Sequence, residues 1–143
     1  PESVGVARAA AKIGVPLGVS LTLGSTSKLS SGESLADAIT MIDEETGQSP
    51  AFYSINCSHP LEFEPAIEPG DWIKRVRGVR PNASRMDKMA LCKIGHLEDG
   101  DPVELGVQCG NLASRDPHMD IWGGCCGTWN THLDEIATNV LAA

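Results

Sequence analysis

Short apolar runs alternate along this chain with segments of helical periodicity, and that alternation limits the folds available to it. Four apolar runs are predicted strands: residues 15–23, 51–57, 78–84 and 119–123. Helical patterns precede and separate them: residues 2–14, 34–47 and 71–77, and segments that begin near 101 and 131. Strands that alternate with helices pair in parallel through right-handed crossovers. The sequence therefore predicts an α/β fold built on a parallel sheet.

Capping signals mark where the predicted helices begin. Asp101 followed by a proline is a strong start, because the aspartate accepts from free N–H groups and the proline has none to satisfy. Thr131 and Asp134 are predicted to cap the last helix, with Leu133 on its buried stripe and His132 toward solvent. Residues 85–100 are predicted to be a loop region with some helical potential.

The charge balance and the short apolar runs argue against several kinds of partner. The chain has 11 basic and 19 acidic residues among 143, a net charge of −8. Such a surface repels nucleic acid and anionic membranes, so we expect neither as a partner. No run approaches the ~18 apolar residues of a membrane span, and the first residues lack the order of a signal peptide. We expect a cytoplasmic protein with one domain over residues 1–143.

Three of the five cysteines are placed to meet at one edge of the predicted sheet. An odd count without a secretory signal predicts free thiols rather than a disulfide framework. Cys57 ends the second predicted strand, and Cys125 and Cys126 follow the fourth. In parallel α/β folds the loops after the carboxyl ends of strands share one edge, where function gathers. Cys92 and Cys109 are predicted core residues, because cysteine is among the most buried residue types.

The adjacent pair Cys125 and Cys126 can bind one metal ion if the backbone turns sharply between them. Gly123, Gly124 and Gly127 supply the conformational freedom for such a turn. Three thiolates would leave one tetrahedral position of Zn²⁺ open, which is the pattern of catalytic zinc sites. Burial of the same cysteines in a core is the alternative, and their spacing alone does not decide between the two.

These cysteines and several other segments resemble the zinc-dependent homocysteine S-methyltransferases. The most specific element is Gly-Gly-Cys-Cys-Gly-Thr at residues 123–128. Further matches lie at residues 16–22, 29–35, 56–60 and 80–84, so the resemblance covers nearly the whole chain. The chain departs from the family where residues 25–27 lack an Asp-Gly, where Ser30 replaces a proline, and over residues 86–92.

The resemblance implies a (β/α)₈ TIM barrel of which this chain resembles only the later half, strands five to eight. It implies that Cys57, Cys125 and Cys126 are the zinc ligands and that Asn56 lies in the substrate site. The reaction would move a methyl group from S-methylmethionine, S-adenosylmethionine or betaine to the thiol of homocysteine, giving methionine. No general base is required once zinc has taken the thiol proton.

Two other functions stay open at this point. Glycine-rich loops after late barrel strands often hold phosphate, and residues 123–128 contain such a loop, although its thiolates would repel an anion. The chain could instead be a zinc-binding fragment without activity of its own, because half a barrel lacks part of the substrate surface. Four strands would leave two unpaired edges and an exposed apolar inner face. We therefore expect association with a second barrel half or with another copy, in a chain truncated from a full barrel.

Two aromatic side chains, His59 and Trp129, lie close in sequence to the predicted metal ligands. His59 lies two residues after Cys57, so both would face the same way on an extended chain. We expect His59 to support the site rather than to bind the metal. Trp129 follows the cysteine pair and is the one tryptophan that we consider as a substrate contact.

Overall fold

The computed structural model describes residues 2–86 and 88–143, without the side chains of Lys88, Met89 and Cys92. Four strands form one parallel sheet in the order of the chain: β1 (Gly18–Leu21), β2 (Phe52–Asn56), β3 (Val76–Arg80) and β4 (Ile121–Trp122). The α-helices are α1 (Glu2–Ile13), α2 (Leu35–Thr46), α3 (Pro60–Phe63), α4 (Lys88–Ile94), α5 (Pro102–Arg115) and α6 (Asn130–Leu141). Two 3₁₀ helices, η1 (Glu64–Ala66) and η2 (Asp71–Arg75), lie between α3 and β3. The predicted α/β class and parallel pairing are confirmed.

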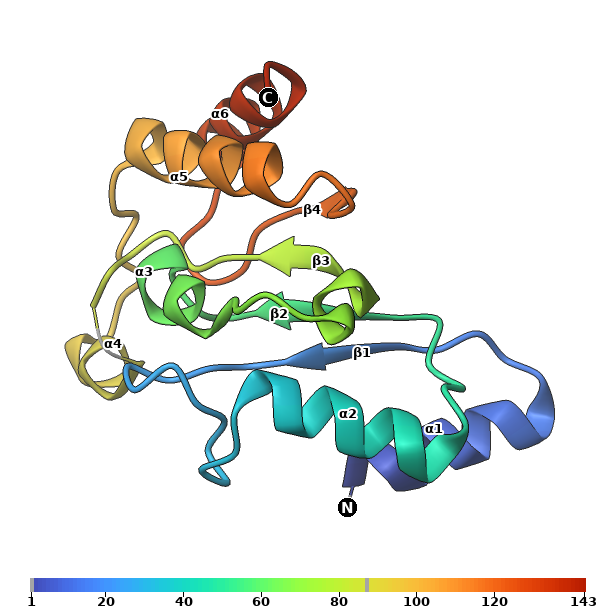
Figure 1. Cartoon of the computed structure of the whole chain (residues 1–143). Helices are drawn as coiled ribbons and strands as arrows, with labels where there is room; N and C mark the ends of the chain where they lie inside the picture. The colour runs from blue at the N-terminus through green and yellow to red at the C-terminus, as the bar shows by residue number, and fades with distance from the viewer. Residues whose placement is uncertain (1, 87) are drawn as a thin grey trace.

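The helices flank an open sheet whose strands all run in the same direction (Figure 1). Helices α1 and α2 lie on the β1 side, and α5 and α6 lie on the β4 side (Figure 1). The short helix α4 lies toward the end at which the strands point (Figure 1). Among the described residues β1 and β4 each pair with one neighbour only, so the sheet has two unpaired edges.

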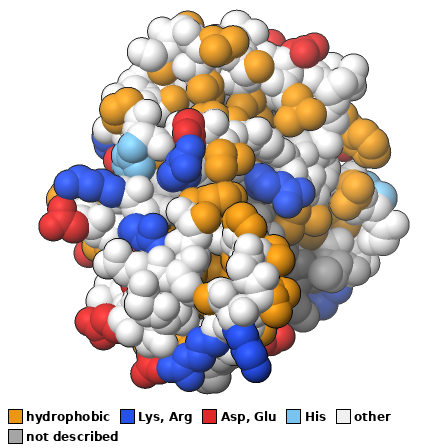
Figure 2. Space-filling view, turned by 90° about the vertical axis from the view of Figure 1, so that its right-hand side faces the viewer, with side chains coloured by type: hydrophobic (Ala, Val, Ile, Leu, Met, Phe, Trp, Pro, Cys, Tyr) orange, Lys and Arg blue, Asp and Glu red, His pale blue; other side chains and the backbone are white. Residues whose placement is uncertain are grey.

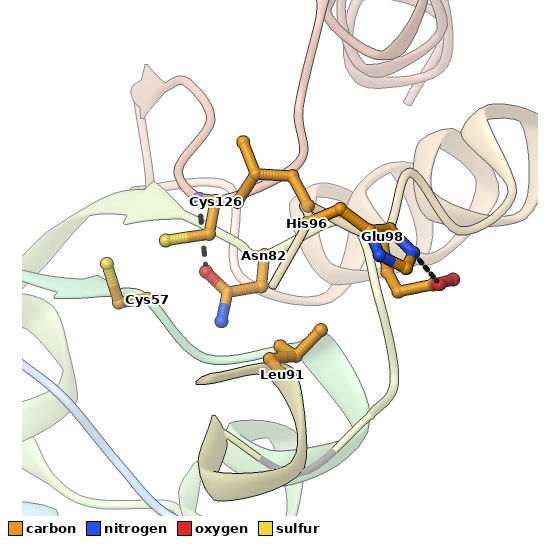
Figure 3. A pocket seen from close by; sticks show the side chains of 7 residues that line it. Cys57, Asn82, Leu91, His96, Glu98 and Cys126 are labelled. Carbon is orange, nitrogen blue, oxygen red and sulfur yellow. Dashed lines mark hydrogen bonds and ion pairs between the residues drawn. The ribbon is translucent and has the colours of Figure 1, made fainter. Parts of the chain in front are cut away.

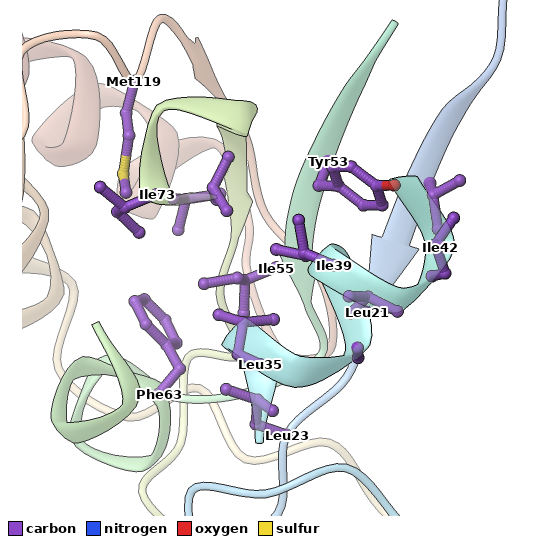
Figure 4. Packing of buried hydrophobic residues seen from close by; sticks show 14 of the residues in the cluster. Leu21, Leu23, Leu35, Ile39, Ile42, Tyr53, Ile55, Phe63, Ile73 and Met119 are labelled. Atoms are coloured by element: carbon purple, nitrogen blue, oxygen red, sulfur yellow. The ribbon is translucent and has the colours of Figure 1, made fainter. Parts of the chain in front are cut away.

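The main core lies between one face of the sheet and the helix α2 (Figure 4). Leu21 and Ile55 are paired in register on neighbouring strands, and both are buried against this helix, as is Ile39 from α2 itself. Side chains alternate along a strand, so every second residue points into this core. A second, smaller cluster joins α5 to α6 through Leu105, Cys109 and Ile136.

The other face of the sheet, which we call the open face, carries small and polar side chains in its middle. Its residues in and after the strands are Ser20, Thr22, Ser54, Asn56 and Arg80. Ser20 and Ser54 share a hydrogen bond between their hydroxyl groups, and the Thr22 hydroxyl donates to Asn56 Oδ1 at 3.3 Å. The predicted apolar inner face is therefore limited to Phe52 and Ile121, which share this face with the glycines they pair with, because most apolar side chains of the strands point to the helices.

The boundaries of three predicted segments differ from the structure. The third strand was predicted at residues 78–84 but spans Val76–Arg80, and it ends before Pro81, which cannot donate to a sheet ladder. The predicted loop at residues 85–100 contains α4, and the stretch after β2, for which no helix is predicted, contains α3.

The predicted capping and facing of the last helix are wrong. Trp129, not Thr131, is the N-cap of α6, and its backbone N–H donates to His132 Nδ1 at 3.1 Å. His132 is only 1% exposed, whereas Leu133 is 44% exposed. His132 can be buried because its other ring nitrogen, Nε2, meets the backbone oxygen of Asp99 at 2.5 Å. Both ring nitrogens are therefore satisfied by partners that sequence periodicity does not reveal.

The end of the sheet at which the strands begin has hydrophobic side chains along its middle, flanked by lysines and arginines (Figure 2). The exposed hydrophobic residues of the α1–β1 connection include Ile13 and Val15. None of the helices that the structure describes combines the length and the apolarity required to cross a membrane.

Candidate metal centre

The structure brings Cys57, Cys125 and Cys126 together at the edge of the sheet to which the strands point. Cys57 directly follows β2, and the other two lie in the turn between β4 and α6. Their Sγ atoms all lie within 4.8 Å of one another. Among the side chains that the structure describes, which do not include that of Cys92, no other set of three histidine, cysteine or acidic groups can hold a metal ion in this way.

Two of these three thiols are paired in the structure. Cys57 and Cys125 form a disulfide with their Cα atoms 5.5 Å apart, and Cys126 has a free, exposed thiol. The sequence predicted free thiols, so this pair departs from that expectation. The cause is tertiary, since two turns 68 residues apart in sequence place the Cα atoms at a separation common for disulfides. Only thiolates bind metal, so metal binding requires that this pair be reduced.

In the reduced form, the three sulfur atoms fit a small thiophilic cation. Zinc–sulfur bonds are about 2.3 Å long, which puts the sulfurs of a tetrahedral site roughly 3.8 Å apart. The three Sγ atoms already lie within 4.8 Å of one another, and reduction must let the bonded sulfurs of Cys57 and Cys125 separate before an ion can lie between them. Among the described residues the group contains no fourth side chain, so a bound ion would keep a position for another ligand.

The position of Cys57 depends on an unusual backbone conformation. Its φ is +52°, in the left-handed region that residues other than glycine seldom adopt. The residue therefore leaves the regular alternation of β2. Its N–H still donates to the backbone oxygen of Arg80 at 3.1 Å, so the turn stays attached to β3. The following residue, Ser58, is buried and donates from its hydroxyl to the backbone oxygen of Leu23 at 2.8 Å.

Glycines shape the turn that carries Cys125 and Cys126, as the sequence predicted. A Cβ atom at Gly124 would collide with the hydroxyl of Thr128, which donates to the backbone oxygen of Cys125 at 2.7 Å. Gly127 has a φ of +76°, and a side chain there would also collide with the backbone oxygen of Glu98. The turn therefore needs glycine at both positions.

The segment after β3 connects the two cysteine turns. The side-chain oxygen of Asn82 accepts from the Cys126 N–H at 3.3 Å, and the Asn82 N–H donates to the backbone oxygen of Ser58 at 3.2 Å. The Cys125 N–H donates to the backbone oxygen of Pro81 at 2.9 Å. Asn82 is 3% exposed. Reasoning from the sequence missed this role, although an asparagine just past a strand end on the same edge was a usable signal.

A cavity of about 350 Å³ lies beside the thiols. Its lining residues are Cys57, Asn82, Leu91, His96, Leu97, Glu98 and Cys126. The thiols of Cys57 and Cys126 point toward one another on one side, and Leu91 from α4 lies across the pocket from Cys126 (Figure 3). The His96 ring contacts Glu98 through Nε2 and Oε1 at 3.0 Å. The region predicted as a loop thus supplies much of the wall of the site.

His59 supports the local fold and is not part of the three-thiol group. It is the N-cap of α3, its Nδ1 accepts from the Leu61 N–H at 3.3 Å, and it is 3% exposed. Burial, and to a smaller extent the positive charge of Arg85, lower the pKa of His59 to about 4. The ring is therefore neutral near pH 7, as a buried helix cap requires.

The remaining predicted residues fall into three different environments. Trp129 is 54% exposed and donates from Nε1 to Asp99 Oδ1 at 2.9 Å, but it does not line the cavity. Cys109 is fully buried between α5 and α6, and burial raises the pKa of its thiol to about 12. Its predicted place in the core is confirmed. The side chain of Cys92 lies outside the described residues. Asn56 lies on the open face next to Cys57.

Fold and site together define a parallel α/β protein with a candidate thiolate metal centre at the carboxyl ends of its strands. The family described as Homocysteine S-methyltransferase matches residues 2–140. The chain therefore belongs to the homocysteine S-methyltransferase family, as its motifs indicated. No curated protein and no solved structure gives a significant match to the chain.

Proposed function

We propose that this chain serves the zinc-dependent transfer of a methyl group from an activated donor to the thiol of homocysteine, giving methionine. Membership of the family supports homocysteine as the methyl acceptor. The observation that carries the metal assignment is the grouping of three Sγ atoms within 4.8 Å at the carboxyl edge of the sheet. The candidate donors are S-methylmethionine, S-adenosylmethionine and betaine, which carry the methyl group on sulfonium or quaternary nitrogen.

In this proposal Cys57, Cys125 and Cys126 hold the zinc ion as thiolates. Zinc bound there would supply the Lewis acidity that keeps a substrate thiol ionised at neutral pH. The side-chain oxygen of Asn82 positions Cys126 by accepting a hydrogen bond from the backbone N–H of that cysteine. Leu91 gives the adjoining cavity an apolar wall.

Asn56 is proposed to contact the substrate. It precedes Cys57, and its side chain lies on the open face, where its Oδ1 accepts from Thr22. Among the described residues its amide nitrogen has no hydrogen-bond partner, so its N–H groups are available to a substrate oxygen. The position of the side chain next to the thiol group supports this role.

We also propose that the four strands are strands five to eight of a (β/α)₈ barrel and that residues 1–143 form one partial domain. Successive strands are neighbours and parallel, as in a barrel, and the candidate site lies at their carboxyl ends. The unpaired edges of β1 and β4 are suited to a second barrel half or to another copy of the chain.

Two alternatives remain distinguishable by experiment. A zinc-binding fragment without activity is favoured by the two open edges of the sheet. A phosphate site at the start of α6 is disfavoured, because the Trp129 N–H already donates to His132 and two cysteines occupy the loop. Equilibrium dialysis against zinc and against a sugar phosphate distinguishes a phosphate site from a zinc site. Phosphate binding without zinc binding would exclude the methyltransferase proposal.

The direct test combines metal content with product formation in the full chain under reducing conditions. Cys57→Ser and Cys126→Ser should each abolish stoichiometric zinc, whereas Cys92→Ser should keep it. Equal losses in all three variants would indicate unfolding instead of ligand removal. Methionine formation from homocysteine is then measured with each donor. A chain that holds zinc but forms no methionine with any donor would support the inactive fragment.

A further inference from the structure

Arg80 is the one arginine without an acidic partner in the part of the chain that the structure describes. Every other arginine forms an ion pair with a carboxylate: Arg8, Arg75, Arg77, Arg85 and Arg115. The chain carries a net charge of −8, so acidic partners are abundant. An unpaired guanidinium in such a chain is therefore a position where an external anion can bind.

Arg80 lies on the open face at the border of the thiol group. Its Cα pairs in register with that of Asn56 on β2. Its backbone oxygen accepts from the Cys57 N–H at 3.1 Å, and the oxygen of the next residue, Pro81, accepts from the Cys125 N–H at 2.9 Å. The backbone of Arg80 is thus tied to both cysteine turns, which fixes where its side chain begins.

The neighbouring strand leaves room for the Arg80 side chain. The next residue across the open face is Gly123, and a Cβ atom there would lie 3.4 Å from Arg80 Cγ and 4.0 Å from Nε. A larger residue at position 123 would crowd the arginine. The hydroxyl of Thr22 and the amide of Asn56 continue this polar strip on the other side. The strip therefore offers a guanidinium beside Gly123 and amide N–H donors at Asn56, on residues whose backbones adjoin Cys57.

We infer that Arg80 binds the carboxylate of an amino-acid substrate on the open face, and so selects substrates that carry one. The planar guanidinium matches a carboxylate with two parallel hydrogen bonds, which an ammonium group cannot supply. Homocysteine and each candidate methyl donor contain a carboxylate, so the ligand chemistry is the same from either source. The inference rests on the proposed function, because that function supplies these substrates.

The test measures binding by calorimetry to the full chain, reduced and loaded with zinc. Two pairs of probes differ only in the carboxylate. L-homocysteine is compared with 3-aminopropanethiol for the acceptor, and S-methylmethionine with the same sulfonium lacking its carboxylate for the donor. The wild type should prefer the carboxylate by about 10- to 100-fold in at least one pair, and that pair identifies the source.

Arg80→Met should remove this preference without changing the affinity for the probe that lacks a carboxylate. Arg77→Met is the matched control, because Arg77 lies on the same strand but pairs with Asp120. A preference that survives in Arg80→Met would overturn the inference. If Arg80→Met fails to hold zinc, Arg80→Lys decides: we expect retained zinc and a reduced preference, and an unchanged preference would overturn the role of the guanidinium.

The failure of the inference is distinguishable from failure of the proposed function. A wild-type chain that binds both members of each probe pair equally contradicts only the role of Arg80. A wild-type chain that holds zinc but binds none of the four probes contradicts the methyltransferase proposal, and the inference with it.

Discussion

The side-chain oxygen of Asn82 accepts a hydrogen bond from the backbone N–H of Cys126 at 3.3 Å, across 44 residues of sequence. Asn82 is buried, and its own N–H donates to the oxygen of Ser58, next to Cys57. One residue that is not itself a candidate ligand thus connects the two cysteine turns, through its side chain to one and its backbone to the other. The geometry of the thiol group depends on this bridge as much as on the cysteines.

Replacing Asn82 by alanine should weaken zinc binding while leaving all three thiols present. The variant removes the acceptor of the Cys126 N–H, and losses of outer residues that orient metal ligands typically cost about 10- to 100-fold in metal affinity. Competition with a chromogenic chelator measures the change. Asn111→Ala, on the exposed side of α5, is the control and should bind zinc as the wild type does. Equal affinity in Asn82→Ala and wild type would contradict the positioning role.

A second prediction concerns Gly124. Gly124→Ala places a Cβ atom against Thr128, whose hydroxyl holds the backbone oxygen of Cys125. We expect a loss of about 1–3 kcal/mol in the free energy of unfolding and a weakened zinc site. Gly5→Ala in α1 is the matched control, since no atom lies within 4 Å of the added Cβ. It should stabilise the chain by up to about 1 kcal/mol through helix propensity. Denaturant unfolding measures the change in stability of both variants, and their zinc content measures the effect on the site.

Local patterns in the sequence predict the parts of this fold that depend on local interactions. The alternation of strands and helices follows from periodicity, and the meeting of Cys57 with Cys125 follows from the parallel topology it implies. The burial of His132 was not predictable, because its partner, the oxygen of Asp99, is supplied by a distant loop. The bridge from Asn82 depends in the same way on contacts between turns. The polar middle of the open face was not predicted, because an apolar inner face was assumed from the general character of barrel sheets.

The pairing of Cys57 with Cys125 predicts that zinc binding depends on the redox state of the chain. Among the described side chains, the oxidised chain offers only the Cys126 thiol at this edge, and we expect it to bind no stoichiometric zinc. Reduction should restore one zinc per chain, because all three thiolates become available. Zinc content before and after reduction measures the effect, and intact mass confirms the disulfide. Stoichiometric zinc in the oxidised chain would show that another set of ligands is used.

A buried ion pair at the other end of the sheet predicts a large effect on stability and none on the site. Arg75 Nε donates to Asp43 Oδ2 at 2.8 Å, and the Tyr53 hydroxyl donates to Asp43 Oδ1 at 2.8 Å. Asp43→Ala leaves the arginine uncompensated in a partly buried place, so we expect a loss of about 3 kcal/mol in the free energy of unfolding.

The exposed pair of Asp71 with Lys74 supplies the control for that experiment. Asp71→Ala should leave stability nearly unchanged, because exposed ion pairs contribute little. Urea unfolding of the two variants gives the comparison. Similar small losses in both would mean that the contacts of Asp43 are as weak as a surface pair.

Burial of Cys109 predicts a loss of stability in alkali that its removal should abolish. The pKa of its thiol rises from the ordinary 9.0 to about 12 in the folded chain, because burial disfavours the thiolate. Below pH 9 both folded and unfolded chains keep the proton, so stability does not depend on this group. Above pH 9 the unfolded chain releases it first, and folding loses about 1.4 kcal/mol per pH unit until the folded thiol also ionises.

The measurement of this effect compares wild type with Cys109→Ala in urea at pH 8 and pH 10 under reducing conditions. The variant is less stable at pH 8, because it leaves a small cavity between α5 and α6. The difference between the two proteins should shrink by about 1.4 kcal/mol at pH 10, since only the wild type carries the raised pKa. A difference that stays constant would show that the thiol of Cys109 reaches water in the folded chain, and α5 would then pack on α6 less tightly than the burial of Cys109 and Leu105 requires.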